Sequence, residues 1–376
     1  MIEEAELAEE IRAARRDRTP VRIIGGGTRL ALGRPVQPSR VLSMSDHSGI
    51  TTYDPGALTL IARAGTPMAE IETALDAENQ ILAFEPMDHR ALLGSSGEPT
   101  IGGVVAANVS GPRRVAAGAC RDFVLGARFI TGEGEIVKNG GRVMKNVTGL
   151  DLAKFMCGAY GTLGVLTEVA LKVLPKPAAA ITLSFDEVDA GQGASLLRRA
   201  LGTPFEVTGA AYDGGRALLR IEGLESQVAD RAERLAQTLG GAPNRIEGEA
   251  HEALWRGIRD VEAFAGREGA VWRLSIKPTD APLVAEALSQ AVGAETRFDW
   301  GGGLIWALTA RDDADSAAAV REALSPFGGY ATLVRGPAAL RASAFQPESK
   351  RIALISEQLR RKFDPDGVLN PGLMAA

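Results

Sequence analysis

Three glycine-rich loops, far apart in the chain, constrain its fold more than any other feature of the sequence. They are GGGTRL at residues 25–30, TIGGVVAANVSGPRR at 100–114 and GAYGTLGVLTE at 158–168. A glycine fixed inside a regular element costs about 0.5–1 kcal/mol relative to alanine, so a close approach to the backbone must compensate. Each loop by itself is explained by a tight turn. Together they predict a shared concavity of free backbone N–H groups, which suits a diphosphate.

The familiar nucleotide-binding motifs do not account for these loops. A GxGxxG fingerprint that began at Gly25 would need glycine where Leu30 stands, and no acidic residue lies where a ribose contact is expected. The sequence also has no GxxxxGK[ST] motif, so nucleotide hydrolysis by a P-loop is unsupported. A dinucleotide held by several separate loops is the interpretation that fits.

Length and composition indicate a globular protein of two or three domains. The 376 residues exceed the size of one hydrophobic core, and 45% are apolar and 24% charged. The net charge of −5, without a long basic run, argues against nucleic acid as a partner. The sequence shows no signal peptide and no apolar segment of about 18–20 residues. We therefore expect a cytoplasmic protein that reaches a membrane only through partners.

Cysteine and histidine are too few and too scattered to predict a metal or redox centre. Cys120 and Cys157 are not spaced as a CxxC pair or a zinc site, and they fit a reducing compartment. The three histidines, His47, His89 and His251, are not paired at ligand spacing. We expect no metal site.

Hydrophobic periodicity predicts helices and short strands up to a pair of prolines. Leu7, Ile11 and Ala14 recur at helical spacing, and Thr66 is expected to cap a second helix that begins at Pro67. The strand segments expected in this part are VRIIG (21–25), LTLIARAG (58–65), the hairpin FVLGARFITGEGEIV (123–137) and GVLTEVALKVLPKP (164–177).

A change of composition at residues 175–177 predicts a domain boundary. Beyond it the strand candidates ALLRIEG, AVWRLSIKP and GGGLIWALTA alternate with helical segments, which predicts an α+β middle domain. The final part has a helix with Ile352, Ile355 and Leu359 on one side, ended by the turn DPDG at 364–367.

Five ordered segments resemble the FAD-binding domain of the vanillyl-alcohol-oxidase-like flavoproteins. They are GGGTRLALG, TIGGVVAANVSG, GACRDFVLGARFITGEGE, KNVTGLDLAKFMCGAYGTLGVLTE and DPDGVLNPG. In the middle domain, AVWRLSIKP, FDWGGGLIWAL and GGYATLVRG are similar to the family of FAD-binding subunits of bacterial glycolate oxidase, also called glycolate dehydrogenase. The resemblance covers nearly the whole chain.

The resemblance implies an α+β fold of three parts. These are an FAD-binding domain at 1–175 with subdomains of about 1–48 and 49–175, a cap domain at 176–335, and a C-terminal segment at 336–376 that returns to the FAD-binding domain. FAD is expected to be bound non-covalently, because GGGTRL offers no histidine for attachment.

The resemblance also assigns contacts with FAD residue by residue. The diphosphate would be held by Gly25, Gly26, Gly27, Thr28 and Arg29. The flavin and ribityl region would lie against Thr100, Gly102, Gly103, Asn108, Ser110 and Gly111. The remaining contacts would come from Gly118, from Gly164 and Val165 near the adenosine, and from Asn370 near the flavin. On this interpretation the small residues let the backbone touch FAD.

Some charged and polar residues near these segments have two interpretations. Arg113 or Arg114 either adds positive charge to the site or is solvated at the surface. Lys145, Asn146 and Asp151 match a segment near the flavin in the family, whereas turn formation and helix capping explain the latter two equally well.

Arg273, in VWRLS, is the candidate for binding a substrate carboxylate, and the catalytic residues are otherwise unassigned. Its planar guanidinium suits bidentate recognition of a carboxylate, and an ion pair within the protein is the alternative. Trp272, Trp300 and Trp306 are expected to lie in the core.

The pattern departs from the catalytic relatives in the family. Tyr160 stands where they usually have a carboxylate, Ala116 and Ala117 replace a larger polar pair, and their histidine-rich metal site has no counterpart. These differences predict a subunit whose flavin is structural or relays electrons. The resemblance implies an FAD-dependent oxidoreductase subunit that supports oxidation of glycolate to glyoxylate, with a paralogous catalytic flavoprotein and an iron–sulfur subunit as its partners. The alternatives are an independent FAD-linked oxidoreductase of a larger 2-hydroxy acid or sugar acid, and a flavin-poor assembly subunit.

Overall fold

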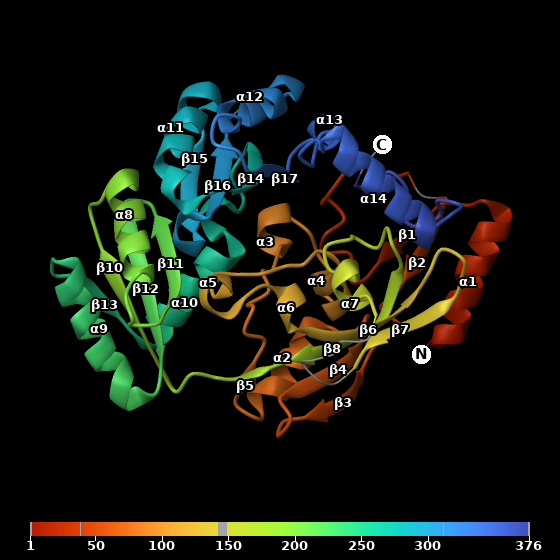
Figure 1. Ribbon diagram of the computed structural model, residues 1–376, viewed down its shortest axis with the longest axis horizontal. Coiled ribbons are helices and arrows are strands. Elements are labelled where there is room, and N and C mark those ends of the chain that lie inside the picture. Colours follow the sequence, from red (N-terminus) through yellow and green to blue (C-terminus); the bar gives the residue numbers. More distant parts are fainter. Residues whose placement is uncertain (1, 38, 142–148, 311, 375–376) are drawn as a thin grey trace.

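Two large antiparallel sheets organise the chain. The computed structural model describes residues 2–37, 39–141, 149–310 and 312–374. Within these ranges the strands form a five-stranded sheet, an eight-stranded sheet and two short pairs (Figure 1). The fold is therefore α+β, as the sequence predicted.

The N-terminal helix and a parallel strand pair form a small unit that also holds the end of the chain. Leu7, Ile11 and Ala14 are fully buried, which confirms the helix predicted from their spacing. Leu369 forms a bridge with Val21 in the first strand. The elements of this unit are α1 (Glu4–Asp17), β1 (Val21–Ile24) and β2 (Arg40–Ser43).

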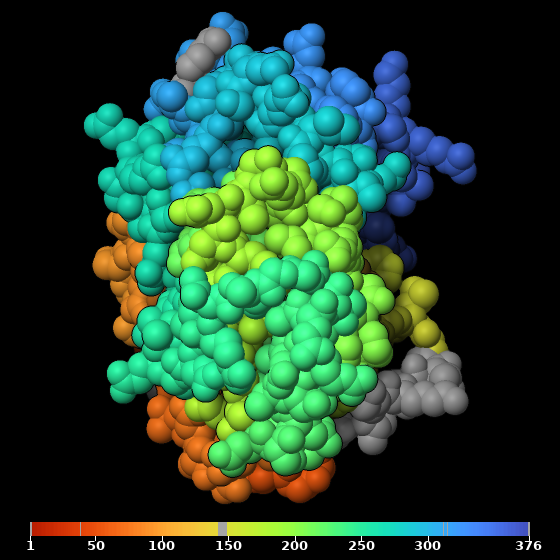
Figure 2. Space-filling view, turned by 90° about the vertical axis from the view of Figure 1, so that its left-hand side faces the viewer, coloured from red at the N-terminus to blue at the C-terminus, as the bar shows by residue number. Residues whose placement is uncertain are grey.

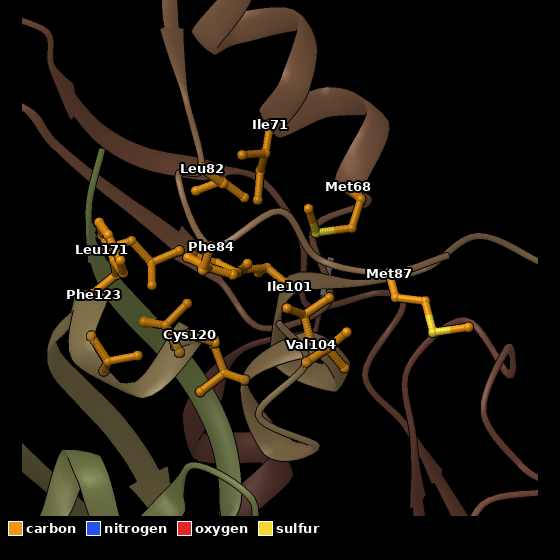
Figure 3. Close-up of a cluster of buried hydrophobic side chains, with 14 of the residues drawn as sticks. Met68, Ile71, Leu82, Phe84, Met87, Ile101, Val104, Cys120, Phe123 and Leu171 are labelled. Atoms are coloured by element: carbon orange, nitrogen blue, oxygen red, sulfur yellow. The ribbon is translucent and has the colours of Figure 1, made fainter. Parts of the chain in front are cut away.

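The five-stranded sheet is antiparallel and packs against short helices. Figure 3 shows its core, a cluster to which one helix contributes Met68 and Ile71, another contributes Ile101 and Val104, and the sheet contributes Leu171. In sheet order the strands are β3 (Ile50–Asp54), β4 (Thr59–Arg63), β8 (Val165–Lys172), β6 (Val124–Ile130) and β7 (Ile136–Gly140), and β5 (Gln80–Ile81) pairs with β9 (Leu174–Pro175). The helices are α2 (Met68–Asp76), α3 (Arg90–Leu93), α4 (Ile101–Ala106), α5 (Arg114–Ala117), α6 (Cys120–Phe123) and α7 (Leu152–Met156). β4, β6, β7 and β8 confirm the predicted segments.

Two local predictions in this part are wrong. Thr66 does not cap α2, because its hydroxyl donates to Arg63 O at 2.7 Å and accepts from Gly49 N at 2.9 Å, and the helix begins one residue after Pro67. The second glycine segment is not only a loop, since its first turns form α4, capped by the Thr100 hydroxyl. Its apolar side chains enter the core, Gly102 packs closely against Ala64, and Gly103 has space beside its Cα.

The eight-stranded sheet begins just beyond the two prolines. The chain leaves the first sheet system at Pro175 and enters the second at Ala179, which supports the domain boundary that we propose there. In sheet order the strands are β13 (Asn244–Ile246), β10 (Ala179–Phe185), β12 (Arg216–Gly223), β11 (Val207–Asp213), β15 (Glu295–Asp299), β16 (Leu304–Thr309), β14 (Ala270–Ser275) and β17 (Tyr330–Arg335). The helices are α8 (Ala190–Leu201), α9 (Glu225–Leu239), α10 (Gly248–Asp260), α11 (Ala281–Val292) and α12 (Ala314–Leu324). Yellow-green and green residues of this part form the centre of the face seen in Figure 2.

The last helices lead the chain back toward its N-terminus (Figure 1). They are α13 (Ala338–Arg341) and α14 (Lys350–Phe363). The predicted amphipathic helix is confirmed as α14, yet its apolar side chains are not covered, since Ile352 and Ile355 are 49% and 46% exposed. The contact with the first part is made at the end of the helix, where Phe363 packs on Phe129 and its carbonyl accepts from Gly132 N.

A buried group of four charged side chains joins the two sheet systems. Glu85, between β5 and α3, accepts two hydrogen bonds from Arg220 of β12, both at 2.8 Å. Arg113 donates its backbone N–H to Glu85 at 2.6 Å and pairs with Glu222 of β12 at 2.7 Å. Because every carboxylate here faces a guanidinium from the other sheet system, the group fixes how the two parts sit together.

Candidate functional site

The loop after β1 presents a row of free backbone N–H groups. Within the described part of the chain, none of the N–H groups of residues 25–30 donates to another protein group. Two of the loop's carbonyl groups are held instead, because the Ser45 hydroxyl donates to Gly25 O at 3.2 Å and the Ser95 hydroxyl to Thr28 O at 2.8 Å. A loop that is held through its carbonyl groups and whose backbone N–H groups are unpaired can donate those N–H groups to phosphate oxygens.

Protein contacts are sufficient to require the first glycines of this loop. A Cβ on Gly26 would lie 1.7 Å from Glu98 O, and one on Gly25 would lie 2.2 Å from the Thr100 hydroxyl oxygen. Glycine at these two positions lets the loop approach Glu98 and Thr100 closely, and the contact of their backbone with FAD stays a prediction.

Three adjoining cavities make up a cleft beside this loop. The first, about 630 Å³ including space open to solvent, lies along residues 22–30 and α4. The second, about 490 Å³, continues past α4 to the third glycine segment. The third, about 1060 Å³, extends toward β14 and β17 of the eight-stranded sheet. Tyr160 lines all three, so the cavities adjoin at this residue, and the third also reaches the eight-stranded sheet.

Most of the predicted cofactor contacts gather at these cavities. The first two cavities are lined by Gly25, Gly26, Gly27, Thr28, Arg29, Thr100, Gly102, Gly103, Gly164 and Asn370. Asn108, Ser110 and Arg273 line the third. Gly111, Gly118 and Val165 line none of the three. The cavities are also lined by residues to which sequence patterns gave no cofactor contact, namely Arg22, Ala106, Ala107, Tyr160 and His89.

Asn370 ties two walls of the cleft together. Its side-chain oxygen accepts from Ile23 N at 2.9 Å, and its side-chain nitrogen donates to Tyr160 O at 2.8 Å. Both Asn370 and Tyr160 have a positive φ, 43° and 51°, a backbone conformation that is uncommon for residues other than glycine and recurs at functional sites. The amide side chain therefore links both walls. Its oxygen and its nitrogen each already form a hydrogen bond with the protein.

Arg29 lies between the first and third cavities. Its Nε donates to His89 Nδ1 at 3.2 Å and its Nη2 to Met87 O at 3.2 Å. Burial lowers the pKa of Arg29 to about 10, and burial together with the charge of Arg29 lowers the pKa of His89 to about 3. At neutral pH the arginine is charged and the imidazole neutral, with Nδ1 as the acceptor.

Trp300 is not simply a core residue, because it is partly exposed at the third cavity. The guanidinium groups of Arg114 and Arg273 lie over its ring, 4.5 and 5.1 Å from the ring centroid. Its indole N–H donates to Gly111 O at 3.0 Å, across the gap between the sheet systems. A φ of 53° for a residue of this size costs of order 1–3 kcal/mol. Trp272 and Trp306, by contrast, are buried as expected.

Asp299 precedes Trp300 and is buried without an ion-pair partner within the described residues. Its carboxylate accepts from Trp300 N at 2.7 Å, yet burial raises its pKa to about 7. A raised folded-state pKa means that stability from this group is lost as pH rises from the unfolded value near 3.8 toward 7.

We expect Asp299→Asn to stabilise the protein relative to the parent chain, and by more at alkaline than at acidic pH. Asparagine keeps an acceptor for Trp300 N but cannot ionise. Urea unfolding of both proteins at about pH 5 and pH 8 measures the difference, which should grow across this window. An equal difference at both pH values would contradict the assignment of a buried, protonated carboxyl.

Other candidates lie outside the cleft or outside the described residues. Arg113 forms ion pairs with Glu222 and Glu85 and is largely buried, so it is neither a cleft residue nor a solvated surface arginine. Asp151 caps α7 through Lys154 N at 3.2 Å, and Lys145 and Asn146 fall outside the described ranges. Among the described residues, no group of three or more histidine, cysteine, aspartate or glutamate side chains is placed to hold a metal ion.

Comparisons with known proteins agree with a dinucleotide cleft. A protein-family model for an FAD binding domain matches residues 3–140. The crystal structure of p-cresol methylhydroxylase superposes with a TM-score of 0.73 at 14% identity, over 100% of this chain and 88% of that one. The class is therefore that of FAD-binding flavoproteins with the vanillyl-alcohol-oxidase type of fold, and FAD is the cofactor.

The sequence comparison narrows this class to one family. Glycolate oxidase subunit GlcE of Escherichia coli K12 is 37% identical over 98% of this chain and 97% of its own length. Glycolate oxidase subunit GlcD of Bacillus subtilis is 32% identical over 46% of this chain and 36% of its own length. The chain belongs to the GlcE family of glycolate oxidase subunits. None of its described helices combines the length and the apolar composition needed to cross a bilayer.

Proposed function

We propose that this chain is the FAD-carrying subunit of a glycolate oxidase complex, which oxidises glycolate to glyoxylate with the main catalytic site on a paralogous flavoprotein subunit. The similarity to GlcE along almost the whole chain carries this proposal, and the similarity to GlcD over 46% of the chain supports a paralogous flavoprotein as its partner. An iron–sulfur subunit completes the proposed complex, which works at the inner face of the membrane through its partners.

The residues of the cleft hold the cofactor in this proposal. The free N–H groups of residues 25–30 bind the diphosphate, and α4 with Gly103 and Ala106 forms the wall against which the ring system lies. Asn370 keeps β1 and the Tyr160 segment at the spacing that the cofactor needs. FAD, when bound, would supply a redox group that relays electrons within the complex.

We expect the purified chain to be yellow and to release FAD on acid precipitation, because its contacts are backbone hydrogen bonds and packing and not a covalent bond. Absorbance of the protein and of the supernatant measures both. Colourless protein that still assembles with its partners would instead support the flavin-poor assembly subunit.

Glycolate should reduce flavin in the complex and not in this chain alone. Anaerobic absorbance spectra of the isolated chain, the isolated paralogue and the co-purified complex distinguish the sites. Rapid reduction of the isolated chain by glycolate would show that this polypeptide is an independent oxidoreductase.

A further inference from the structure

We infer that this chain has its own binding site for a small carboxylate, in the third cavity, with Arg114 and Arg273 as the groups that bind the anion. Arg114 comes from α5, directly after the second glycine segment, and Arg273 from β14 of the eight-stranded sheet. Both line the cavity. The site therefore exists only where the two sheet systems meet.

The two guanidinium groups lack the partners that other enclosed arginines of this chain have. Within the described residues neither Arg114 nor Arg273 forms an ion pair or a side-chain hydrogen bond. Arg220, which is 3% exposed, is paired with Glu85 and Glu222. A partly buried charge without a counter-charge is unfavourable. One anion in the cavity would provide a counter-charge for both Arg114 and Arg273.

The rest of the cavity supplies no competing charge. His89 is neutral, as its pKa of about 3 requires, and burial raises the pKa of Tyr160, so the phenol is also neutral. Burial lowers the pKa of Arg114 and of Arg273, but a guanidinium stays protonated in proteins. The cavity thus carries two positive charges at neutral pH.

Trp300 brings the two charges to one side chain. Both guanidinium groups lie over its ring, the indole N–H donates to Gly111 O, and the backbone N–H of Trp300 donates to the Asp299 carboxylate. A guanidinium that rests on an indole face keeps its N–H groups at the edge free for a carboxylate. The positive φ of this tryptophan costs free energy, and such strained conformations are found mainly at active sites and ligand-binding sites.

The position of the cavity indicates the class of acid. Leu32, Ala107 and Tyr160 line both this cavity and the first one, so an acid bound here would lie beside the proposed FAD position. The other walls combine the apolar Met87 and Phe345 with polar side chains such as Ser110 and Thr332, which suit a small organic acid that has a hydroxyl or carbonyl group beside its carboxylate. The assignment of the acid as a 2-hydroxy or 2-oxo monocarboxylate rests on the proposed function. The inference that an anion binds here rests on the two arginines alone.

Calorimetric titration of the full chain with glycolate, glyoxylate, glycolamide and sulfate tests the site. We expect glycolate and glyoxylate to bind, and glycolamide, which has the same size without the charge, not to bind. Arg114→Gln and Arg273→Gln should each weaken the acids by about 10- to 100-fold. Arg234→Gln is the matched control, because Arg234 lies over the Phe205 ring far from the cavity on α9 and should bind the acids like the parent chain.

Thermal unfolding of the same variants separates binding from structure. Removing an enclosed charge without a partner should leave the melting temperature of Arg114→Gln and Arg273→Gln unchanged or raised, whereas a purely structural arginine would lower it. Unchanged acid affinity in both variants, equal binding of glycolamide, or sulfate binding as tight as glycolate would each overturn the inference.

The FAD content of each preparation, measured separately, keeps this test apart from the proposed function. A chain that retains FAD and binds no acid contradicts the carboxylate site alone. A chain that binds the acids through Arg114 and Arg273 but purifies without FAD contradicts the proposed cofactor role alone.

Discussion

Replacing Gly103 with leucine is expected to yield a folded protein that retains essentially no FAD. A Cβ on Gly103 has room, since the nearest atoms are Arg29 Nη1 and the Thr100 hydroxyl oxygen, both at 3.4 Å. The longer leucine side chain continues into the first and second cavities, which Gly103 lines. It would occupy the space that the proposal gives to the cofactor. Absorbance of the purified variant and of its acid supernatant measures the loss.

The fold should survive this substitution because Gly103 lies inside α4. Leucine is favoured over glycine in a helix by roughly 0.8–1 kcal/mol, so the free energy of unfolding should not fall. Gly103→Ala is the matched control: it adds only the Cβ, which fits, and should keep FAD. If Gly103→Leu were as yellow as the parent chain, the assignment of these cavities to FAD would fail.

A neighbouring glycine shows what sequence patterns could and could not predict here. Gly26 and Gly103 look alike in the sequence, and both were expected to touch FAD, Gly26 at the diphosphate and Gly103 near the flavin. In the structure the Cβ direction of Gly26 is filled by Glu98 O, whereas that of Gly103 opens into the cleft. Whether the Cβ direction of a glycine is filled or open depends on a segment that is distant in the sequence. Hydrophobic periodicity carries no information about the position of such a segment.

The regular elements were predictable because their signals are local. Buried residues every three or four positions in α1, and apolar runs ended by glycine or proline in β4, β6 and β8, identified the elements that the structure contains. The Thr66 prediction failed although the residue type was right, since a hydroxyl can serve a turn instead of a helix end. The second glycine segment was missed as a helix because its glycines mask the apolar spacing of Ile101, Val104 and Val105.

The third cavity was the part that sequence patterns could least predict. Arg114 and Arg273 were each noted, but their common contact with Trp300 joins segments that are far apart in the chain. Trp300 was expected in the core because tryptophan is usually enclosed. Its place after a buried aspartate and before two further positive-φ residues, Gly301 and Gly302, is the local signal of an unusual turn.

Glu85→Gln is expected to destabilise the protein by about 3–5 kcal/mol at neutral pH, because it removes one member of a buried ion group. Arg220 would lose both charged contacts with this carboxylate, and Arg113 would lose a nearby counter-charge. Urea unfolding measures the change. The control is Glu357→Gln, which breaks the exposed pair with Arg361 on α14 and should change little, as surface pairs of this type contribute about 0.3–0.5 kcal/mol.

The pH dependence and a double variant show whether the loss is electrostatic. Burial by itself would raise the pKa of Glu85, but the charge and hydrogen bonds of Arg220, with Arg113, hold it below its usual 4.5. Stability from a carboxyl with a lowered pKa is present above that value and is lost below it, so the deficit of Glu85→Gln should shrink as the pH falls below 4.5.

Removing both members of one pair should cost less than removing Glu85 alone. In Glu85→Leu with Arg220→Met, the remaining Arg113 and Glu222 still face each other at 2.7 Å, and no charge is left without a partner. The two sheet systems would then be joined by one ion pair and apolar contacts. If the double variant were less stable than Glu85→Gln, the four side chains would act through packing, and the cap would be held on the cofactor domain by shape and not by charge.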